Sequence, residues 1–207
     1  MSSEIQLSLA ICLAIPNLVF AQFESDIHAW VTQDARNPPV QNSVLFIGAS
    51  TIRVYEALTR DFADYNAIQR GFGSASLDDL SRYADEIILP YDPEVIVMFT
   101  RSPETTEDNI RQDYLDFFEL IHSKQNQDRP PIPILFVGAY PRLTTFAGRW
   151  ITTGQTHNSI IQQIAAENDA VHFVDTASRM LETAAEPSQP PAEHLFATDR
   201  HHLNAEG

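Results

Sequence analysis

The sequence predicts an α/β fold in which helices cover both faces of a parallel central sheet, giving a three-layer α/β/α sandwich of the flavodoxin-like kind. Short apolar runs recur along the chain and alternate with longer stretches of helical spacing. The runs are continuously apolar, which is typical of parallel strands buried on both faces. Parallel neighbours also need a crossover about as long as a helix, and the intervening stretches provide that length.

The clearest predicted strand is Val44-Leu45-Phe46-Ile47, which Gly48 ends. Similar runs span residues 94–99, 134–137 and 171–174, with a weaker one at 67–69. Helical spacing is found over residues 23–34, 52–59, 77–88, 104–122 and 155–167. In sheets of this kind ligands bind beyond the carboxyl ends of the strands, so functional residues are expected there.

Length and charge narrow the classes of function. A chain of 207 residues with 43% hydrophobic content is enough for one core, and one domain is expected. The formal charge of −15 comes from acidic residues spread along the chain, so the surface should repel polyanions. Nucleic acid and anionic membranes are therefore excluded as expected partners, and the oligomeric state is not predicted.

The N-terminal segment is expected to be a signal peptide. Residues 7–21 are apolar and end in Val19-Phe20-Ala21, which predicts removal of residues 1–21, a mature domain of residues 22–207 and a secreted or periplasmic location. The run is too short for a stable membrane span, which needs about 20 apolar residues. It departs from the usual pattern because Glu4 is its only early charge, and the alternative is a buried helix. Cys12 is the only cysteine, so the mature chain would have no disulfide and no thiolate ligand.

Ser50 follows the first predicted strand in Gly48-Ala49-Ser50-Thr51-Ile52-Arg53. A serine between a strand and a helix can be a nucleophile, because the helix N-terminus offers free N–H groups to a developing oxyanion. The alternative is that Ser50 only caps the helix. The Gly-x-Ser-x-Gly elbow of other hydrolases is absent, since Ile52 occupies its last glycine position.

Asp199 and His202 lie near the other end of the chain, in Asp-x-x-His-Leu-Asn. On one turn, the aspartate can accept the imidazole Nδ1–H and leave Nε2 to take a proton from serine. The adjacent His201 and His202 could also suggest a metal, but their side chains diverge and no helical His pair accompanies them. No metal or cofactor is expected. Four other histidines are interpreted as surface or hydrogen-bonded core residues: His157, His172, His194 and His201.

In order along the chain, these motifs resemble the GDSL/SGNH hydrolase family over about residues 24–207. The blocks are Gly48 to Arg53, Arg70-Gly71-Phe72-Gly73-Ser74, Leu89-Pro90-Tyr91 and Asp199 to Gly207. The resemblance implies a serine esterase without a metal, in which Ser50 is the nucleophile, His202 the general base and Asp199 its orienting partner. It also implies an oxyanion hole made by the N–H of Ser50, a backbone N–H at Gly73 or Ser74, and an asparagine side chain from a third block.

Two departures from the family pattern affect that oxyanion hole. Ser74 occupies the position at which the family usually has a glycine, and a backbone N–H survives that change. After Phe99-Thr100 the family has a Gly-x-Asn-Asp segment, whereas this chain continues directly to Arg101-Ser102. Asn109 lies in a predicted helix and is not assigned the missing role. The chain also stops within the last motif, before the family's usual closing helix.

The first functional hypothesis is therefore a hydrolase of short acyl esters, on a small molecule or a carbohydrate. The second is a catalytically impaired relative that binds a carbohydrate or acylated ligand, which the missing asparagine favours. Phosphate-ester chemistry is the least favoured hypothesis, because the sequence shows no glycine-rich phosphate-binding loop with a lysine. Tyr140 and Trp150 are either core residues or part of a cleft wall, and the shape of the 142–154 loop is not predicted.

Overall fold

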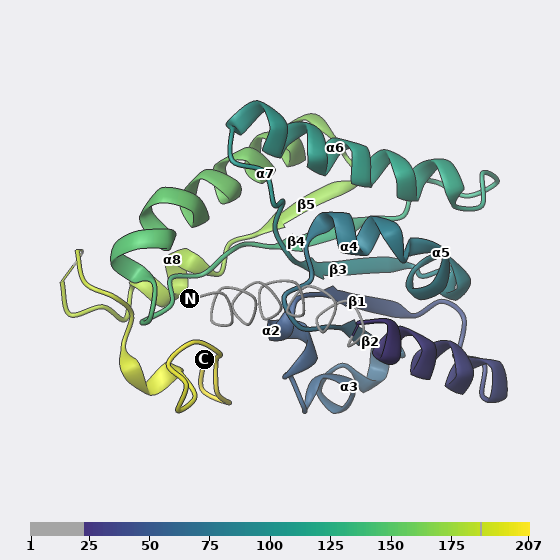
Figure 1. The fold of residues 1–207 in the computed structure, drawn as a ribbon, viewed down its shortest axis with the longest axis horizontal. Coiled ribbons are helices and arrows are strands. Elements are labelled where there is room, and N and C mark those ends of the chain that lie inside the picture. The colour runs from purple at the N-terminus through teal and green to yellow at the C-terminus, as the bar shows by residue number, and fades with distance from the viewer. Residues whose placement is uncertain (1–22, 187) are drawn as a thin grey trace, which may run out of the picture. The chain divides into compact units, whose positions relative to one another are not determined.

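The computed structural model describes residues 23–186 and 188–207. Residues 40–207 contain a parallel sheet of five strands in the order β2-β1-β3-β4-β5, which confirms the predicted fold class (Figure 1). The strands are β1 (Val44–Gly48), β2 (Ile68–Gly71), β3 (Val95–Phe99), β4 (Ile134–Val137) and β5 (Val171–Val174). All five coincide with the predicted apolar runs, including the weak one.

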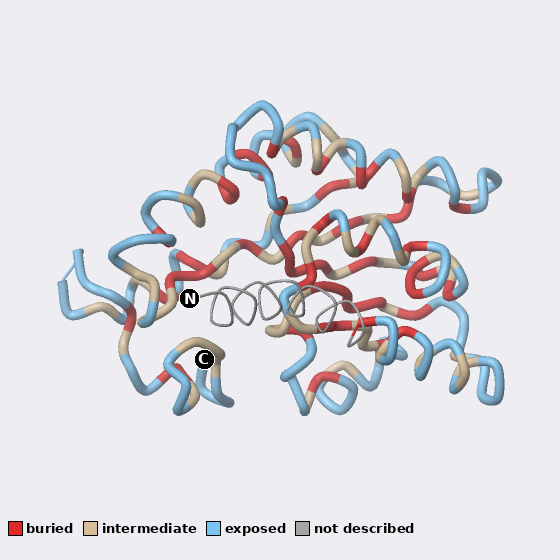
Figure 2. The backbone as a smooth tube through the Cα atoms, in the orientation of Figure 1, coloured by how far each residue is buried: buried red, intermediate tan, exposed pale blue. Residues whose placement is uncertain are grey.

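Each face of the sheet has its own core. On one face, buried Phe136 of β4 lies edge to face with Tyr114 of α6 (Glu107–Lys124), and Tyr114 in turn contacts His157 of α7 (Gln155–Glu167). On the other face, Phe46 and Phe99 belong to a cluster formed with neighbouring helices and the last loop of the chain. The strands appear in Figure 2 as the most continuously buried part of the backbone. Apolar side chains on both faces explain why the strand sequences do not alternate.

Two predicted helices are each split into two shorter ones. The stretch 52–59 forms α2 (Ser50–Arg53) and α3 (Leu58–Asp61), because the Gln69 side chain donates to the carbonyls of Ile52 and Tyr55 and satisfies the end of α2. The stretch 77–88 forms α4 (Leu77–Arg82) and α5 (Ala84–Ile87). Ser76 begins α4 through a capping box with Asp79.

Several short elements have no counterpart in the predicted pattern. The loop of residues 142–154 contains a π-helix, Phe146–Gly154, which leads directly into α7. Its wide turn is seen in the N–H of Trp150, which bonds to the carbonyl of Thr145. The others are α8 (Ala177–Leu181) and the 3₁₀ turns Ala63–Tyr65, Leu89–Tyr91 and Glu193–Leu195.

The N-terminal part of the chain forms a separate unit that ends at Pro39. Residues 23–36 in it are helical, in agreement with the predicted helix over 23–34. The predicted signal peptide of residues 1–21 lies outside the described residues, and its removal stays a prediction. Among the described residues, no helix has the length and apolar character required to cross a membrane.

Candidate active site

Ser50 lies at the carboxyl end of β1, on the first turn of α2. The chain turns at Gly48, whose φ of +134° and close approach to the Phe99 carbonyl exclude a side chain, since a Cβ there would lie 2.0 Å from that oxygen. The Ala49 N–H donates to the same carbonyl at 2.8 Å. Ala49, not Ser50, is the N-cap, and no side chain caps α2. The Ser50 hydroxyl is therefore not used as a helix cap.

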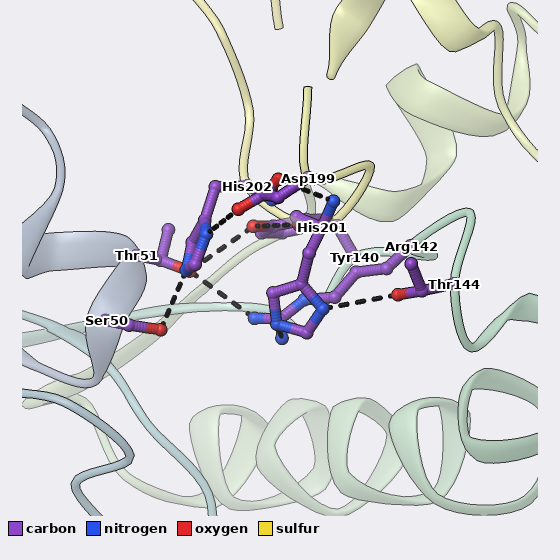
Figure 3. A network of polar contacts seen from close by, with 8 residues as sticks. All are labelled: Ser50, Thr51, Tyr140, Arg142, Thr144, Asp199, His201 and His202. Atoms are coloured by element: carbon purple, nitrogen blue, oxygen red, sulfur yellow. Dashed lines mark hydrogen bonds and ion pairs between the residues drawn. The ribbon is translucent and has the colours of Figure 1, made fainter. Parts of the chain in front are cut away.

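A continuous chain of hydrogen bonds joins Ser50 to His202 and Asp199 (Figure 3). The Ser50 Oγ lies 2.9 Å from His202 Nε2, and His202 Nδ1 lies 2.6 Å from Asp199 Oδ2. A carboxylate can only accept, so Nδ1 carries the proton and Nε2 is the nitrogen that accepts from the serine hydroxyl. Residues separated by 152 positions in sequence thus meet in the order that a serine nucleophile requires.

Asp199 is held as a carboxylate by its own turn. Its Oδ1 accepts the backbone N–H groups of His201 and His202, each at 2.9 Å. The hydrogen bond from the His202 ring, followed by these two backbone bonds, holds the pKa of Asp199 well below its usual value. The spacing Asp-x-x-His therefore supplies both the partner of the imidazole and the turn that positions it.

Asn204 fixes the loop that carries His202. Its side-chain nitrogen donates to the carbonyls of His194 and Phe196, at 2.6 and 3.1 Å. Its side-chain oxygen accepts the N–H groups of Glu206 and Gly207. The backbone adds a bond from the Ala197 N–H to the His202 carbonyl. Asn204 is thus a positioning residue, a role that the motif Asp-x-x-His-Leu-Asn alone does not indicate.

Asn204→Ala is expected to lower kcat by about 10²-fold, because a displacement of His202 by about 1 Å is enough for a loss of that size. Asn204→Asp keeps the accepting oxygen and should retain part of the lost activity. The measurements are kcat, and the rate at which a fluorophosphonate probe labels Ser50, on protein whose circular dichroism matches the parent. An unchanged kcat in Asn204→Ala would show that His202 is positioned without the Asn204 side chain.

A cavity of about 310 Å³ opens beside Ser50. Its walls come from the ends of β1, β3 and β4, the π-helix and the loop that carries His201. Tyr140 and Trp150 line it although each is only 5% exposed. Each is therefore both a core residue and part of the cavity wall, the two alternatives that the sequence left open. The volume is at the small end of the range for ligand sites.

No family model matches this sequence, and no curated protein matches it. Solved structures do. A protein from Streptococcus pneumonia described as a platelet activating factor superposes with a TM-score of 0.71 at 18% identity, covering 95% of this chain and 92% of that one. A GDSL-like lipase from Bacteroides thetaiotaomicron gives 0.64 at 17% identity over 87% and 90%. An acetylxylan esterase from Geobacillus stearothermophilus gives 0.56 at 13% identity over 80% and 89%.

The chain has the GDSL/SGNH hydrolase fold. At sequence identities of 13 to 18%, the similarity of these structures to the chain shows the fold alone. The roles of individual residues in this chain therefore depend on its own geometry, beginning with the groups around Ser50.

Gly73 and Ser74 are the two loop residues expected to donate a backbone N–H to the oxyanion. Ser74 lines the cavity together with Ser50, whereas Gly73 does not. Ser74 has φ +61°, in the left-handed region that glycine favours, which explains why a glycine is usual there. Within the described part of the chain, the backbone N–H groups of Ser50 and Ser74 donate to no other group. Two residues that line the cavity thus keep a backbone N–H that no described group of the chain uses.

No asparagine among the described residues lines this cavity. The Asn109 side chain donates to Glu104 at 3.2 Å, and both amide atoms of Asn158 bond to the backbone of Ala139. After β3 the chain bonds to the neighbouring loop, through the Thr100 hydroxyl to the Ala75 carbonyl at 2.6 Å. Arg101 then occupies the cavity wall where the Gly-x-Asn-Asp segment is missing.

Arg142, His201 and Thr51 form a second polar network next to the triad, which the sequence motifs did not indicate (Figure 3). Arg142 contacts the Nε2 of His201 and lies 3.4 Å from the Thr51 hydroxyl. Tyr140 joins the network through Thr51 at 3.3 Å. The loop after β4 and the loop of His202 are thus linked at the rim of the cavity.

Proposed function

We propose that this protein is a carboxylester hydrolase that acts on short acyl esters through an acyl-serine intermediate. The observation that carries the proposal is the unbroken set of hydrogen bonds from Asp199 through His202 to Ser50. A cavity lined by Ser50 and Ser74, whose backbone N–H groups donate to no other group of the described chain, supports it. The GDSL/SGNH fold is consistent with this chemistry.

The proposed reaction begins when the Ser50 Oγ attacks the ester carbonyl and its proton passes to His202 Nε2. The N–H groups of Ser50 and Ser74 donate to the oxyanion of the tetrahedral intermediate. As the intermediate collapses, His202 returns the proton to the departing alcohol oxygen and the acyl group stays on Ser50. Water then attacks the acyl-serine with His202 again as the base, and the acid is released. Asp199 stabilises the imidazolium in both steps.

The second candidate is a protein that binds an acylated or carbohydrate ligand without efficient turnover. It is favoured by one observation, the lack of an asparagine donor in the cavity wall. Both candidates keep the serine and its base, so both could be acylated at Ser50. They differ in the rate of deacylation and therefore in the overall rate of turnover.

The test combines short 4-nitrophenyl esters with a fluorophosphonate probe, followed by peptide mass spectrometry to locate the label. Turnover together with label on Ser50 is the result expected of the esterase. Label on Ser50 without turnover would establish the binding protein instead, and label on another serine would overturn the assignment of the nucleophile.

A further inference from the structure

The cavity beside Ser50 is lined by basic residues and by no acidic residue of the described chain. Arg101, Arg142 and Arg149 lie in its wall, with His157 and His201. The whole chain has 28 acidic against 13 basic residues, so the sign of this cavity is opposite to that of the protein. Three of the 13 Lys and Arg residues meet in one small cavity, and a concave site of one sign concentrates ligands of the other.

Neutral partners fix Arg142 in place. A guanidinium only donates, so the His201 Nε2 that it contacts must be the accepting nitrogen. The other nitrogen, Nδ1, then donates to the Thr144 hydroxyl at 3.3 Å. The guanidinium also lies over the Tyr140 ring, 5.1 Å from its centroid. These contacts orient Arg142 without neutralising its charge (Figure 3).

Arg101 and Arg149 likewise have no carboxylate partner among the residues that the structure describes. Neither side chain makes an ion pair or a hydrogen bond with another group in the described ranges, 23–186 and 188–207. Arginine side chains placed in a cavity wall in this way can bind an oxyanion through paired N–H groups. The nearby carboxylate of Asp199 is already bonded to His202 and to two backbone N–H groups.

Two imidazoles in the cavity wall have pKa values below the usual value for histidine. Burial, and after it the charge of Arg101, lowers the pKa of His157 to about 4. Burial, and after it the charge of Arg142, also lowers the pKa of His201, with a smaller contribution from Arg149. Both rings are therefore neutral near pH 7, and the positive charge of the cavity belongs to the arginines.

We infer that the preferred substrates are esters that carry a carboxylate close to the scissile bond, which Arg101, Arg142 and Arg149 bind in the cavity beside Ser50. This inference rests on the proposed esterase function and specifies its substrate class. A cavity of about 310 Å³ is small enough that a charged group in it lies near the reacting carbonyl. The carboxylate belongs either to the acyl part or to the alcohol part of the ester, and matched substrates distinguish the two.

Two pairs of substrates test the preference. Mono-4-nitrophenyl succinate against 4-nitrophenyl butyrate varies the charge on the acyl side, and 4-acetoxybenzoate against 4-acetoxybenzamide varies it on the alcohol side. In one of the pairs, kcat/KM should favour the anionic member by about tenfold or more at low ionic strength and less as salt is added. Equal or faster hydrolysis of the neutral member in both pairs would overturn the inference.

Variants locate the source of the preference. Arg149→Gln and Arg101→Gln should each reduce the ratio of anionic to neutral kcat/KM by about tenfold, the value of one charge-assisted hydrogen bond. Arg60→Gln is the matched control, because Arg60 is an exposed arginine of α3 paired with Asp61. It removes the same net charge and should leave the ratio unchanged. A ratio that falls equally in all three variants would show an effect of net charge and would contradict a built subsite.

Binding without turnover separates this inference from the proposed function. Calorimetry on the Ser50→Ala protein should show succinate binding about tenfold or more tightly than succinamide. That result supports the anionic subsite even if no ester is hydrolysed, in which case only the esterase proposal fails. Equal affinities for the two compounds would overturn the subsite even if the esterase activity is found.

Discussion

Ser50→Ala and His202→Ala are each expected to lower kcat for ester hydrolysis by about 10⁴- to 10⁶-fold, the loss seen when a serine nucleophile or its base is removed. The reason is that Ser50 provides the attacking oxygen and His202 is the group that accepts its proton, at 2.9 Å. The double variant should be no slower than either single variant, since the two residues act as one unit. Initial rates with a short 4-nitrophenyl ester measure all three.

His194→Ala is the matched control for the histidine variant. His194 lies on the same C-terminal loop and is exposed, and its backbone carbonyl, not its ring, accepts the bond from Asn204. Its replacement should leave kcat within about twofold, as expected for a surface substitution away from the site. Activity above a few per cent of the parent in Ser50→Ala would falsify the nucleophile assignment.

Restoring the missing segment should have the second-largest effect. A Gly-Asp-Asn-Asp insertion between Thr100 and Arg101 is expected to raise kcat by about 10²- to 10³-fold, because one oxyanion donor is worth that much. It should change KM less, since the donor acts on charge that develops in the transition state. The kinetic constants are compared with those of a Gly-Asp-Ala-Asp insertion of equal length, which adds the loop without the donor.

Both insertions must first match the parent in circular dichroism and melting temperature, because the hydrogen bonds of Thr100 to Ala75 and of Leu77 to Arg101 hold this loop. Equal kcat in the asparagine and alanine insertions would mean that another group completes the oxyanion hole. The same conclusion would follow if the parent already turns over near the typical enzyme value of about 10 s⁻¹.

The sheet could be predicted because its signal is local. Each strand is a short apolar run, and the weak run at residues 67–69 became β2 through pairing with β1. The helix that was expected over 52–59 is interrupted because of Gln69, a residue on the neighbouring strand that satisfies its carbonyls. A long-range bond of that kind leaves no periodic trace in the sequence, and neither does the π-helix before α7.

The candidate site likewise combines residues that short motifs predict with residues that only the fold brings together. Ser50, Asp199 and His202 are carried by short motifs with a fixed spacing, and the structure brings the three predicted residues together. The arginines of the cavity come from two connections: Arg101 follows β3, and Arg142 and Arg149 lie between β4 and α7, Arg149 within the π-helix. No motif joins them, so their meeting depends on the fold. The different places of Gly73 and Ser74 likewise depend on a single left-handed residue, which the sequence alone does not reveal.

The loop that carries both Asp199 and His202 makes nucleophile activation depend on local opening. Ser50 belongs to the central strand-helix turn. The loop, by contrast, attaches to the rest of its unit through the side chains of Leu195, Phe196 and Leu203 and through the contacts of His201 with Arg142 and Tyr140. Such a segment can detach at a free energy well below that of global unfolding. The serine would then lose its base while the sheet stays intact. Mild heat or denaturant should accordingly extinguish activity before the far-ultraviolet signal of the fold begins to change.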